Sequence, residues 1–204
     1  MKHKEKTEQS KRHLLLTGIK LFGTNGYDAT SVSEIEAELN LTRGAIAYHY
    51  KSKLGFFEAT VNKYLFERVM PSSVPNEFRN SLKDFILKYI TMLEDECVSL
   101  MNNGVRNVAG TYLNLETDAL RSIPDFRNKC AEQNRCQLAV LEQVIRNAIS
   151  SGEIKDNAIP IVVAEMFLNV VIGQNYRSNV DGSRYYTDGM LRQFNNLYRL
   201  ISNQ

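Results

Sequence analysis

Residues 31–53, SVSEIEAELNLTRGAIAYHYKSK, decide the fold predicted for this chain. Ser31 can accept a hydrogen bond from a free backbone amide, and Glu34, three residues later, can reach back to the cap, so the two predict a capping box at the start of a helix. Asn40 tolerates a positive φ angle and stands where the chain must reverse. Thr42 is a second N-cap candidate. The stretch therefore predicts two short helices around a tight turn, an arrangement typical of helix-turn-helix DNA-binding elements.

The second of these helices carries the candidate DNA-contacting residues. Arg43 is the best candidate for base reading, because a guanidinium can donate twice to guanine O6 and N7; a phosphate contact is the alternative. Ala45 and Ala47 are candidates for thymine methyl contacts, although small residues also permit close helix packing. Contacts to phosphates are predicted for the hydroxyl, imidazole and ammonium groups of Thr42, Tyr48, His49, Lys53 and Lys11. For Tyr48 the alternative is packing against the first helix.

These residues resemble the opening of the TetR family of bacterial transcriptional regulators. The apolar first helix and the Gly-aromatic pair that ends it fit the family through Lys11, Leu14, Leu15, Leu21, Phe22, Gly26 and Tyr27. The family's spacing continues through Thr30, Val32, Ile35, Leu41, Thr42, Ile46, Tyr48, His49, Tyr50, Lys51, Ser52 and Lys53. The resemblance is specific over the first quarter of the chain and weak beyond it. It implies a homodimeric, all-helical repressor or activator whose C-terminal domain binds a small ligand or senses another signal.

Four departures from the family pattern carry expectations of their own. Gly18 replaces a usual alanine inside the first helix, which should cost roughly 0.5–1 kcal/mol of helix stability. Glu36 takes the place of a small residue between the two short helices, so its carboxylate is expected to reach solvent or a basic partner. Ala47 replaces a tyrosine that commonly touches DNA. Leu54 and Gly55 replace acidic residues at the start of the fourth helix and weaken its favourable interaction with the helix dipole.

Composition and charge fit a cytoplasmic, DNA-binding protein. The chain has 204 residues and 43% hydrophobic content, enough for a core of its own beside a small module. No apolar run approaches the ~20 residues of a membrane helix, and the first residues, MKHKEKTEQSKR, lack the apolar segment of a signal peptide. Net charge is only +2, but residues 1–55 carry nine Lys and Arg against six acids. Basic residues lie at both ends of this module, including an arm over residues 1–10 that is expected to be flexible; a solvated charged face is the alternative.

Cysteine and histidine usage gives no support for a metal site, a cofactor or catalysis. Cys97, Cys130 and Cys136 are odd in number and form no C-x-x-C pair, so they predict buried thiols, with oxidant sensing as the alternative. The histidines are His3, His13 and His49, and two of them lie in or near the basic arm. No H-E-x-x-H, P-loop or G-x-S-x-G motif is present. We therefore expect a protein that is not an enzyme and uses no cofactor.

The whole sequence predicts an all-α fold in two domains. Residues 1–53 form the helix-turn-helix domain and residues 54–204 a helical ligand-binding and dimerisation domain. Helical periodicity predicts a first helix over about residues 7–25 and a fourth from Ser52 to about residue 69, before the loop PSSVP at 71–75. Later helices are expected over residues 82–102, 105–119, from Pro124 to Gly152, 158–172 and 184–202.

Residues 158–172 are apolar nearly all round, so a helix there must be covered on two sides. With the last helix it predicts a dimer interface of about 2,000 Å² or more. The candidate interface residues are Ile159, Val163, Phe167, Val170, Leu191, Phe194 and Tyr198. A deep core inside a monomer is one alternative. Another is a helical adaptor whose C-terminal domain binds a different protein, with DNA binding secondary.

The predicted effector site rests on aromatic, flexible and amide side chains expected on inner helix faces. These are Tyr89, Met92, Tyr112, Phe126, Gln137, Met166, Asn169 and Tyr176, each of which could equally be ordinary core. Their mixture favours a moderately polar or aromatic organic ligand over a cationic one, since Glu96 and Glu165 are the only plausible acids there. The expected function is therefore a ligand-responsive, homodimeric repressor of a palindromic double-stranded DNA operator, with a small-molecule effector of unknown identity.

Overall fold

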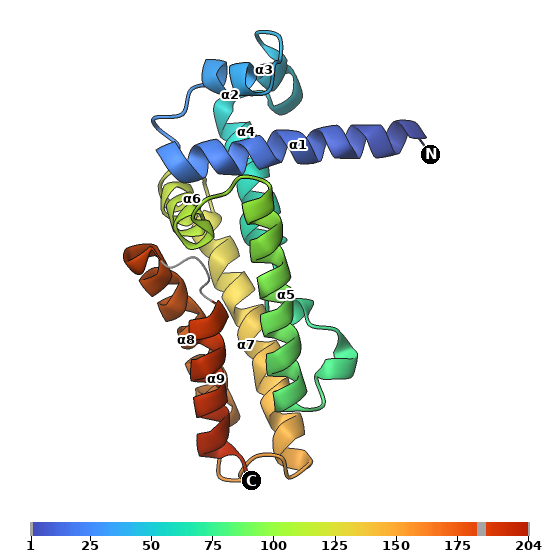
Figure 1. The fold of residues 1–204 in the computed structure, drawn as a ribbon, viewed down its shortest axis with the longest axis vertical. Helices are drawn as coiled ribbons and strands as arrows, with labels where there is room; N and C mark the ends of the chain where they lie inside the picture. The colour runs from blue at the N-terminus through green and yellow to red at the C-terminus, as the bar shows by residue number, and fades with distance from the viewer. Residues whose placement is uncertain (1, 183–186, 204) are drawn as a thin grey trace. The chain divides into compact units, whose positions relative to one another are not determined.

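The computed structural model describes residues 2–182 and 187–203, with side chains from residue 9 onward. All regular secondary structure in these ranges is helical, apart from an isolated bridge between Ile154 and Ser202 (Figure 1). The helices are α1 (Lys2–Asn25), α2 (Val32–Glu38), α3 (Ala45–Tyr50), α4 (Lys53–Val61), α5 (Leu82–Asn102), α6 (Val108–Ser122), α7 (Phe126–Ser150), α8 (Pro160–Asp181) and α9 (Thr187–Ile201). A π-helical turn, Asn62–Phe66, continues α4, and two 3₁₀ turns, Pro71–Ser73 and Asn76–Phe78, precede α5. The predicted all-α fold is confirmed.

Some element ends differ from the sequence prediction. The backbone is helical from Lys2, so residues 2–10 of the predicted arm are part of α1. The fourth helix ends in the π-helical turn at Phe66 instead of near residue 69. α6 begins at Val108, because the Asn107 side chain caps its first turn by accepting from the Gly110 amide at 2.9 Å. The predicted start of the last helix, residues 184–186, lies outside the described residues.

The chain divides into two compact units whose boundaries differ from the predicted boundary at residue 53. The first unit is Met1–Arg68 with Leu100–Arg127, and the second is Val69–Ser99 with Asn128–Gln204. The difference arises because α6, expected in the C-terminal domain, packs against α1 and α4. None of the helices in the described residues is long and apolar enough to cross a membrane.

The core of the first unit is an aromatic cluster that joins α1 to α4 and to the end of α3. The Phe22 ring lies 4.9 Å from the Phe57 ring and 5.9 Å from the Phe56 ring, and Tyr50 adds an edge contact to Phe56 at 4.9 Å. Phe22, Phe56 and Phe57 are fully buried. Burial of each large aromatic side chain contributes roughly 1.5–3 kcal/mol, so the cluster fixes α3 onto the α1–α4 pair.

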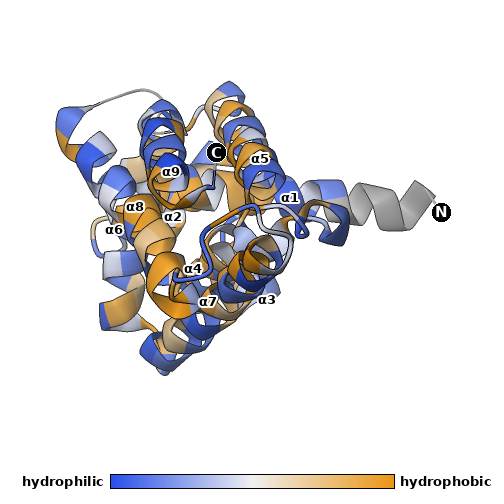
Figure 2. Ribbon diagram, turned by 90° about the horizontal axis from the view of Figure 1, so that it is seen from below, coloured by the Kyte–Doolittle hydropathy of each residue, from blue (hydrophilic) through white to orange (hydrophobic). Residues whose placement is uncertain are grey.

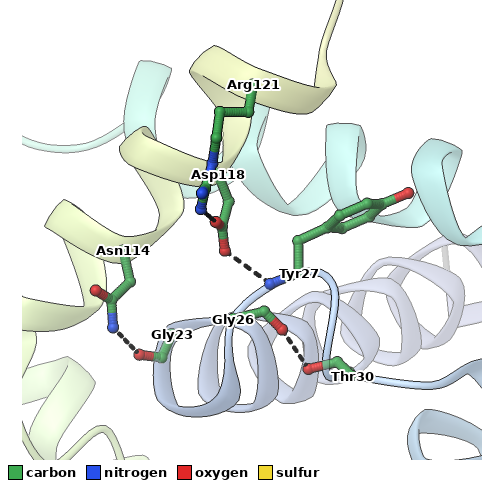
Figure 3. A network of polar contacts seen from close by, with 7 residues as sticks. All are labelled: Gly23, Gly26, Tyr27, Thr30, Asn114, Asp118 and Arg121. Atoms are coloured by element: carbon green, nitrogen blue, oxygen red, sulfur yellow. Dashed lines mark hydrogen bonds and ion pairs between the residues drawn. The ribbon is translucent and has the colours of Figure 1, made fainter.

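Polar side chains of α6 hold the C-terminal end of α1 (Figure 3). The Asp118 carboxylate accepts the Tyr27 backbone N–H at 2.7 Å and also forms an ion pair with Arg121. Asn114 donates to the Gly23 carbonyl at 2.9 Å. These bonds satisfy backbone groups that the end of a helix leaves without intrahelical partners. The end of α1, and the turn that leads to α2, are therefore fixed by α6.

The second unit is built on the apolar faces of α5, α7, α8 and α9. Tyr89 of α5 stacks on Phe194 of α9 with ring centroids 6.5 Å apart, and Phe194 contacts Phe167 of α8 at 4.9 Å. α5 is amphipathic: its apolar stripe is buried, and apolar and polar residues alternate along the helix in Figure 2. The Glu153 carboxylate caps α5 by accepting from the amides of Leu82 and Lys83 at 3.0 and 2.9 Å.

Candidate nucleic-acid interface

α2 begins and ends as the sequence predicts. Ser31 accepts from the Glu34 amide at 3.1 Å, and the Glu34 carboxylate accepts from the Ser31 amide, which confirms the capping box. Ile35 is fully buried and anchors the helix to the core of the first unit. Asn40 has a φ angle of 50° at the turn, as expected of a residue that tolerates this region.

The recognition helix α3 starts later than predicted. Its N-cap is Gly44, with φ 90° and ψ −2°, and not Thr42. Gly44 suits this position because a positive φ is strained for residues with a Cβ atom. Arg43 therefore lies in the turn ahead of the helix, one residue before the cap. Ile46 is fully buried and fixes the rotation of α3 about its axis.

Glu36 neither reaches solvent nor pairs with a basic side chain through its described bonds. Its side chain is only 5% exposed, and Oε1 accepts from the backbone amides of Gly44 at 2.9 Å and Ile46 at 3.1 Å. The expectation from sequence is corrected: the carboxylate of α2 lies against the start of α3 and satisfies its backbone donors. Sequence reasoning missed this role because its partners are backbone groups eight and ten residues away.

The candidate DNA-contacting residues lie mainly on the exposed side of the α2–α3 element. Thr42, Arg43, Ala47, Tyr48 and His49 are exposed, as is Lys11 on α1, while Ala45 and Lys53 are partly buried. The structure therefore brings residues 42–49 together on one short, accessible segment. Its side chains offer a guanidinium, hydroxyls, an imidazole and methyl groups, which suit phosphates and base edges.

Two of these side chains need individual comment. Tyr48 is 85% exposed and its ring makes an edge contact with His49, so the alternative of packing against the first helix is wrong. The Lys53 ammonium lies 4.4 Å from the centroid of the Tyr27 ring and donates to the Asp28 carbonyl at 3.3 Å. Lys53 is thus held beside the turn that follows α1.

The residues predicted for an effector site do not form one group. Tyr89 is buried in the second unit, and Gln137 there accepts the Ser72 amide at 3.0 Å. Met92 is half-buried. Tyr112 and Phe126 are buried in the first unit, where Phe126 contacts Phe66 and Tyr112 lies under Arg68. The remaining three, Met166, Asn169 and Tyr176, are exposed on α8.

The second unit contains a small apolar cavity of about 10 Å³. It is lined by Pro71, Phe85, Ile86, Tyr89, Leu141, Phe167, Val171 and Phe194. A space of this size holds roughly one water, whereas ligand pockets usually measure about 300–1,000 Å³. Of the predicted effector residues only Tyr89 lines it. In the described residues no group of three or more His, Cys, Asp or Glu is placed to hold a metal ion.

The predicted dimer-interface residues divide between the core and the surface of the second unit. Val163, Phe167 and Phe194 are buried within it and cannot face a partner, which corrects their assignment. Val170, Leu191 and Tyr198 are half-buried, and Ile159 is exposed. The exposed face of α8 instead carries Val162, Met166, Asn169, Gly173, Tyr176 and Val180, spaced alternately by four and three residues. This spacing places them on one side of the helix.

The cysteines do not share one environment. Cys97 is buried, as expected, but Cys130 is half-buried and Cys136 is exposed.

The described residues are helical and include an exposed helix-turn-helix element. This element places the protein in the class of helix-turn-helix DNA-binding proteins. Residues 14–60 match the family model described as bacterial regulatory proteins, tetR family. The match covers the helix-turn-helix element, so this part of the chain is similar to the TetR family of bacterial regulatory proteins.

The chain is similar in sequence to curated transcriptional regulators. The chain is 36% identical over 56 residues to the transcriptional regulator AcrR of Shigella flexneri, covering 28% of this chain and 26% of that protein. It is 27% identical over 164 residues to the transcriptional repressor AcnR of Corynebacterium diphtheriae, covering 79% and 77%. The structure of a SmeT–triclosan complex is similar with a TM-score of 0.67 and 18% identity, over 96% of this chain and 93% of that one. The last similarity shows the fold alone.

Proposed function

We infer that this protein is a homodimeric transcriptional repressor that binds a palindromic DNA operator and is released by a small-molecule effector. The observation that carries the proposal is the exposed side of segment 42–49: Tyr50, directly after it, packs on Phe56 of the aromatic core, while the polar and basic side chains of the segment stay in solvent. Tyr48 is 85% exposed, and His49 and Arg43 near it are exposed too. So exposed an aromatic ring contributes little to the stability of the fold, and its position suits contact with another molecule.

Homodimerisation is supported by the exposed stripe of α8. Val162, Met166, Tyr176 and Val180 are each between 45% and 66% exposed. Gly173 lies in the same stripe with no atom within 4 Å of the position its Cβ would take, so a second helix can approach closely there. An exposed helix face that carries several large apolar side chains is typical of an interface. A two-fold axis through the stripe would also pair two DNA-binding units, which a palindromic operator requires.

An effector would have to enlarge the apolar cavity of the second unit. The lining side chains from α5, α7, α8 and α9 are apolar or aromatic, so an uncharged ligand with an aromatic or aliphatic body is favoured. The similar SmeT structure is a complex with triclosan. Ligand entry would separate these helices. If the DNA-binding conformation disfavours that separation, the bound ligand would shift the protein away from this conformation and release the DNA.

Selection from a library of random DNA duplexes tests the DNA-binding part of this proposal. The purified protein should enrich a palindromic sequence whose half-sites lie about one helical turn, ~34–36 Å, apart. Binding should weaken with salt, with each neutralised phosphate adding about 0.9 to the log–log slope. The absence of any enriched duplex at physiological salt would exclude the proposal.

A further inference from the structure

The start of the recognition helix has no cap of its own. α3 has only six residues, and its N-cap, Gly44, has no side chain that could accept a hydrogen bond. The first amides of a helix lack intrahelical acceptors, and leaving them unsatisfied in a buried position is costly. The Ala45 amide donates to the Thr42 carbonyl at 3.1 Å. The amides of Gly44 and Ile46 still require acceptors.

Glu36 supplies both acceptors from the neighbouring helix. The single atom Oε1 accepts from Gly44 at 2.9 Å and from Ile46 at 3.1 Å, on either side of Ala45. Two bonds to one oxygen fix the first turn of α3 in position and in direction relative to α2. Hydrogen bonds to a charged acceptor are roughly twice as strong as neutral ones, and burial excludes competing water.

The segment fixed in this way contains the proposed DNA-contacting residues. Arg43 is bonded through its peptide to Gly44, and Ala45 lies between the two amides that Glu36 holds. A small rotation of the first turn of α3 would shift these side chains relative to the base edges. Contacts to bases depend on such geometry more than contacts to phosphates do.

We propose that Glu36 is a positioning residue for DNA sequence recognition: from α2, its buried carboxylate caps α3 and holds Arg43 and Ala45 in register with the bases. The proposal rests on the DNA-binding function proposed above. Glu36 does not contact DNA itself. Its removal is therefore expected to reduce discrimination between sequences more than general attraction to DNA.

Three variants separate the cap from charge and folding effects. Glu36→Gln keeps an acceptor oxygen of similar reach, and Glu36→Ala removes it. Glu38→Ala is the matched control, because Glu38 carries the same charge on the same helix and is exposed. Each would be titrated by fluorescence anisotropy with the duplex selected by the wild-type protein and with a scrambled duplex. Circular dichroism would report folding.

Glu36→Ala should lower the ratio of selected to scrambled affinity at least about tenfold, while Glu36→Gln and Glu38→Ala stay within about threefold of the wild type. The proposal would be overturned if Glu36→Ala and Glu38→Ala had equal ratios of affinity for the selected and the scrambled duplex. It would also be overturned if Glu36→Gln lowered this ratio as much as Glu36→Ala. If Glu36→Ala does not fold, the titration of Glu36→Gln and amide exchange in the wild type remain decisive.

Amide hydrogen exchange tests the cap independently of DNA. In the wild type, the Gly44 and Ile46 amides should exchange at least about tenfold more slowly than in an unstructured chain, because each is bonded to Oε1. If the Gly44 and Ile46 amides exchanged as fast as in an unstructured chain, the capping role of Glu36 would be excluded. A wild-type protein that binds no DNA sequence would contradict the proposed function, whereas this measurement would still test the position of Glu36.

Discussion

Gly18 lies where α1 and α4 approach too closely for a methyl group. A Cβ atom there would lie 2.5 Å from Thr60 Oγ1 and 3.0 Å from the Phe56 ring. Thr60 is fully buried and its hydroxyl donates to the Phe56 carbonyl at 2.9 Å, so it cannot move aside without losing that bond. The glycine that costs helix propensity therefore permits the close packing that fixes α1 on α4.

Replacing Gly18 by alanine should destabilise the protein even though alanine is the better helix former. Overpacking costs about 1–3 kcal/mol, which exceeds the roughly 0.5–1 kcal/mol gained in propensity. Urea unfolding would measure the difference. The cost of Gly18→Ala should shrink in a Thr60→Ala background, because the nearest atom is then absent. A stabilised Gly18→Ala protein, or an unchanged cost in the double variant, would contradict this packing explanation.

Tyr64 gives the first unit a dependence on alkaline pH. Burial raises the pKa of Tyr64 to about 12, and the nearby Arg12 guanidinium opposes this only in part. Since the pKa is higher in the folded than in the unfolded chain, the stabilising contribution is fully present below pH 10 and is lost as pH rises from about 10 to 12. Wild type should therefore lose more stability than Tyr64→Phe between pH 9 and 11 in parallel urea titrations. Identical losses would show that Tyr64 makes no such contribution.

Among the elements, we propose that α3 carries sequence recognition and that α2 supports it. If Arg43 contacts a guanine, Arg43→Ala should weaken binding to the selected duplex by about 10- to 100-fold, corresponding to about 1–3 kcal/mol, and affect scrambled DNA much less. Lys63→Ala is a suitable control, since Lys63 is an exposed base of the same unit that pairs with Glu67. Titrations of both duplexes distinguish the outcomes. Equal losses on both would mean that Arg43 contacts phosphate only.

Local signals predicted the N-caps of α2 and α4, whereas the N-cap of α3 was predicted at Thr42 and lies at Gly44. Ser31 with Glu34, and Ser52 with the Gly55 amide, bond within three residues, so sequence spacing was sufficient to predict them. Glu36 bonds to backbone amides across a turn, and nothing in its spacing indicates which groups will face it. Its role became visible only once α2 and α3 were placed together.

At the scale of the whole molecule, α8 shows how far composition can predict an interface. Its apolar character on all sides indicated that two surfaces must cover it; one is the core of the second unit, and the second surface stays a prediction. Which residue faces which surface depends on helix rotation, which one sequence does not fix. Phe167 therefore lies in the core although an interface was predicted, while Met166, predicted to bind ligand, lies on the exposed stripe.

Disruption of this stripe tests dimerisation. Met166→Glu places a charge on a surface that the proposed dimer would bury, so the protein should become monomeric in light scattering at micromolar concentration. Leu120→Glu is the matched control: Leu120 is 41% exposed, close to the 45% of Met166, but lies on α6 of the other unit. A wild-type monomer, or a Met166→Glu variant that remains dimeric, would contradict the assignment of the interface.

The stoichiometry and specificity of DNA binding test the central claim most directly. The selected duplex would be titrated with the protein, with anisotropy to measure affinity and mass measurement of the complex to count protomers. We predict that two protomers bind each palindromic site, at least about 1,000-fold more tightly than scrambled DNA at physiological salt. Equal affinity for the two duplexes would contradict the account of this protein as an operator-binding regulator.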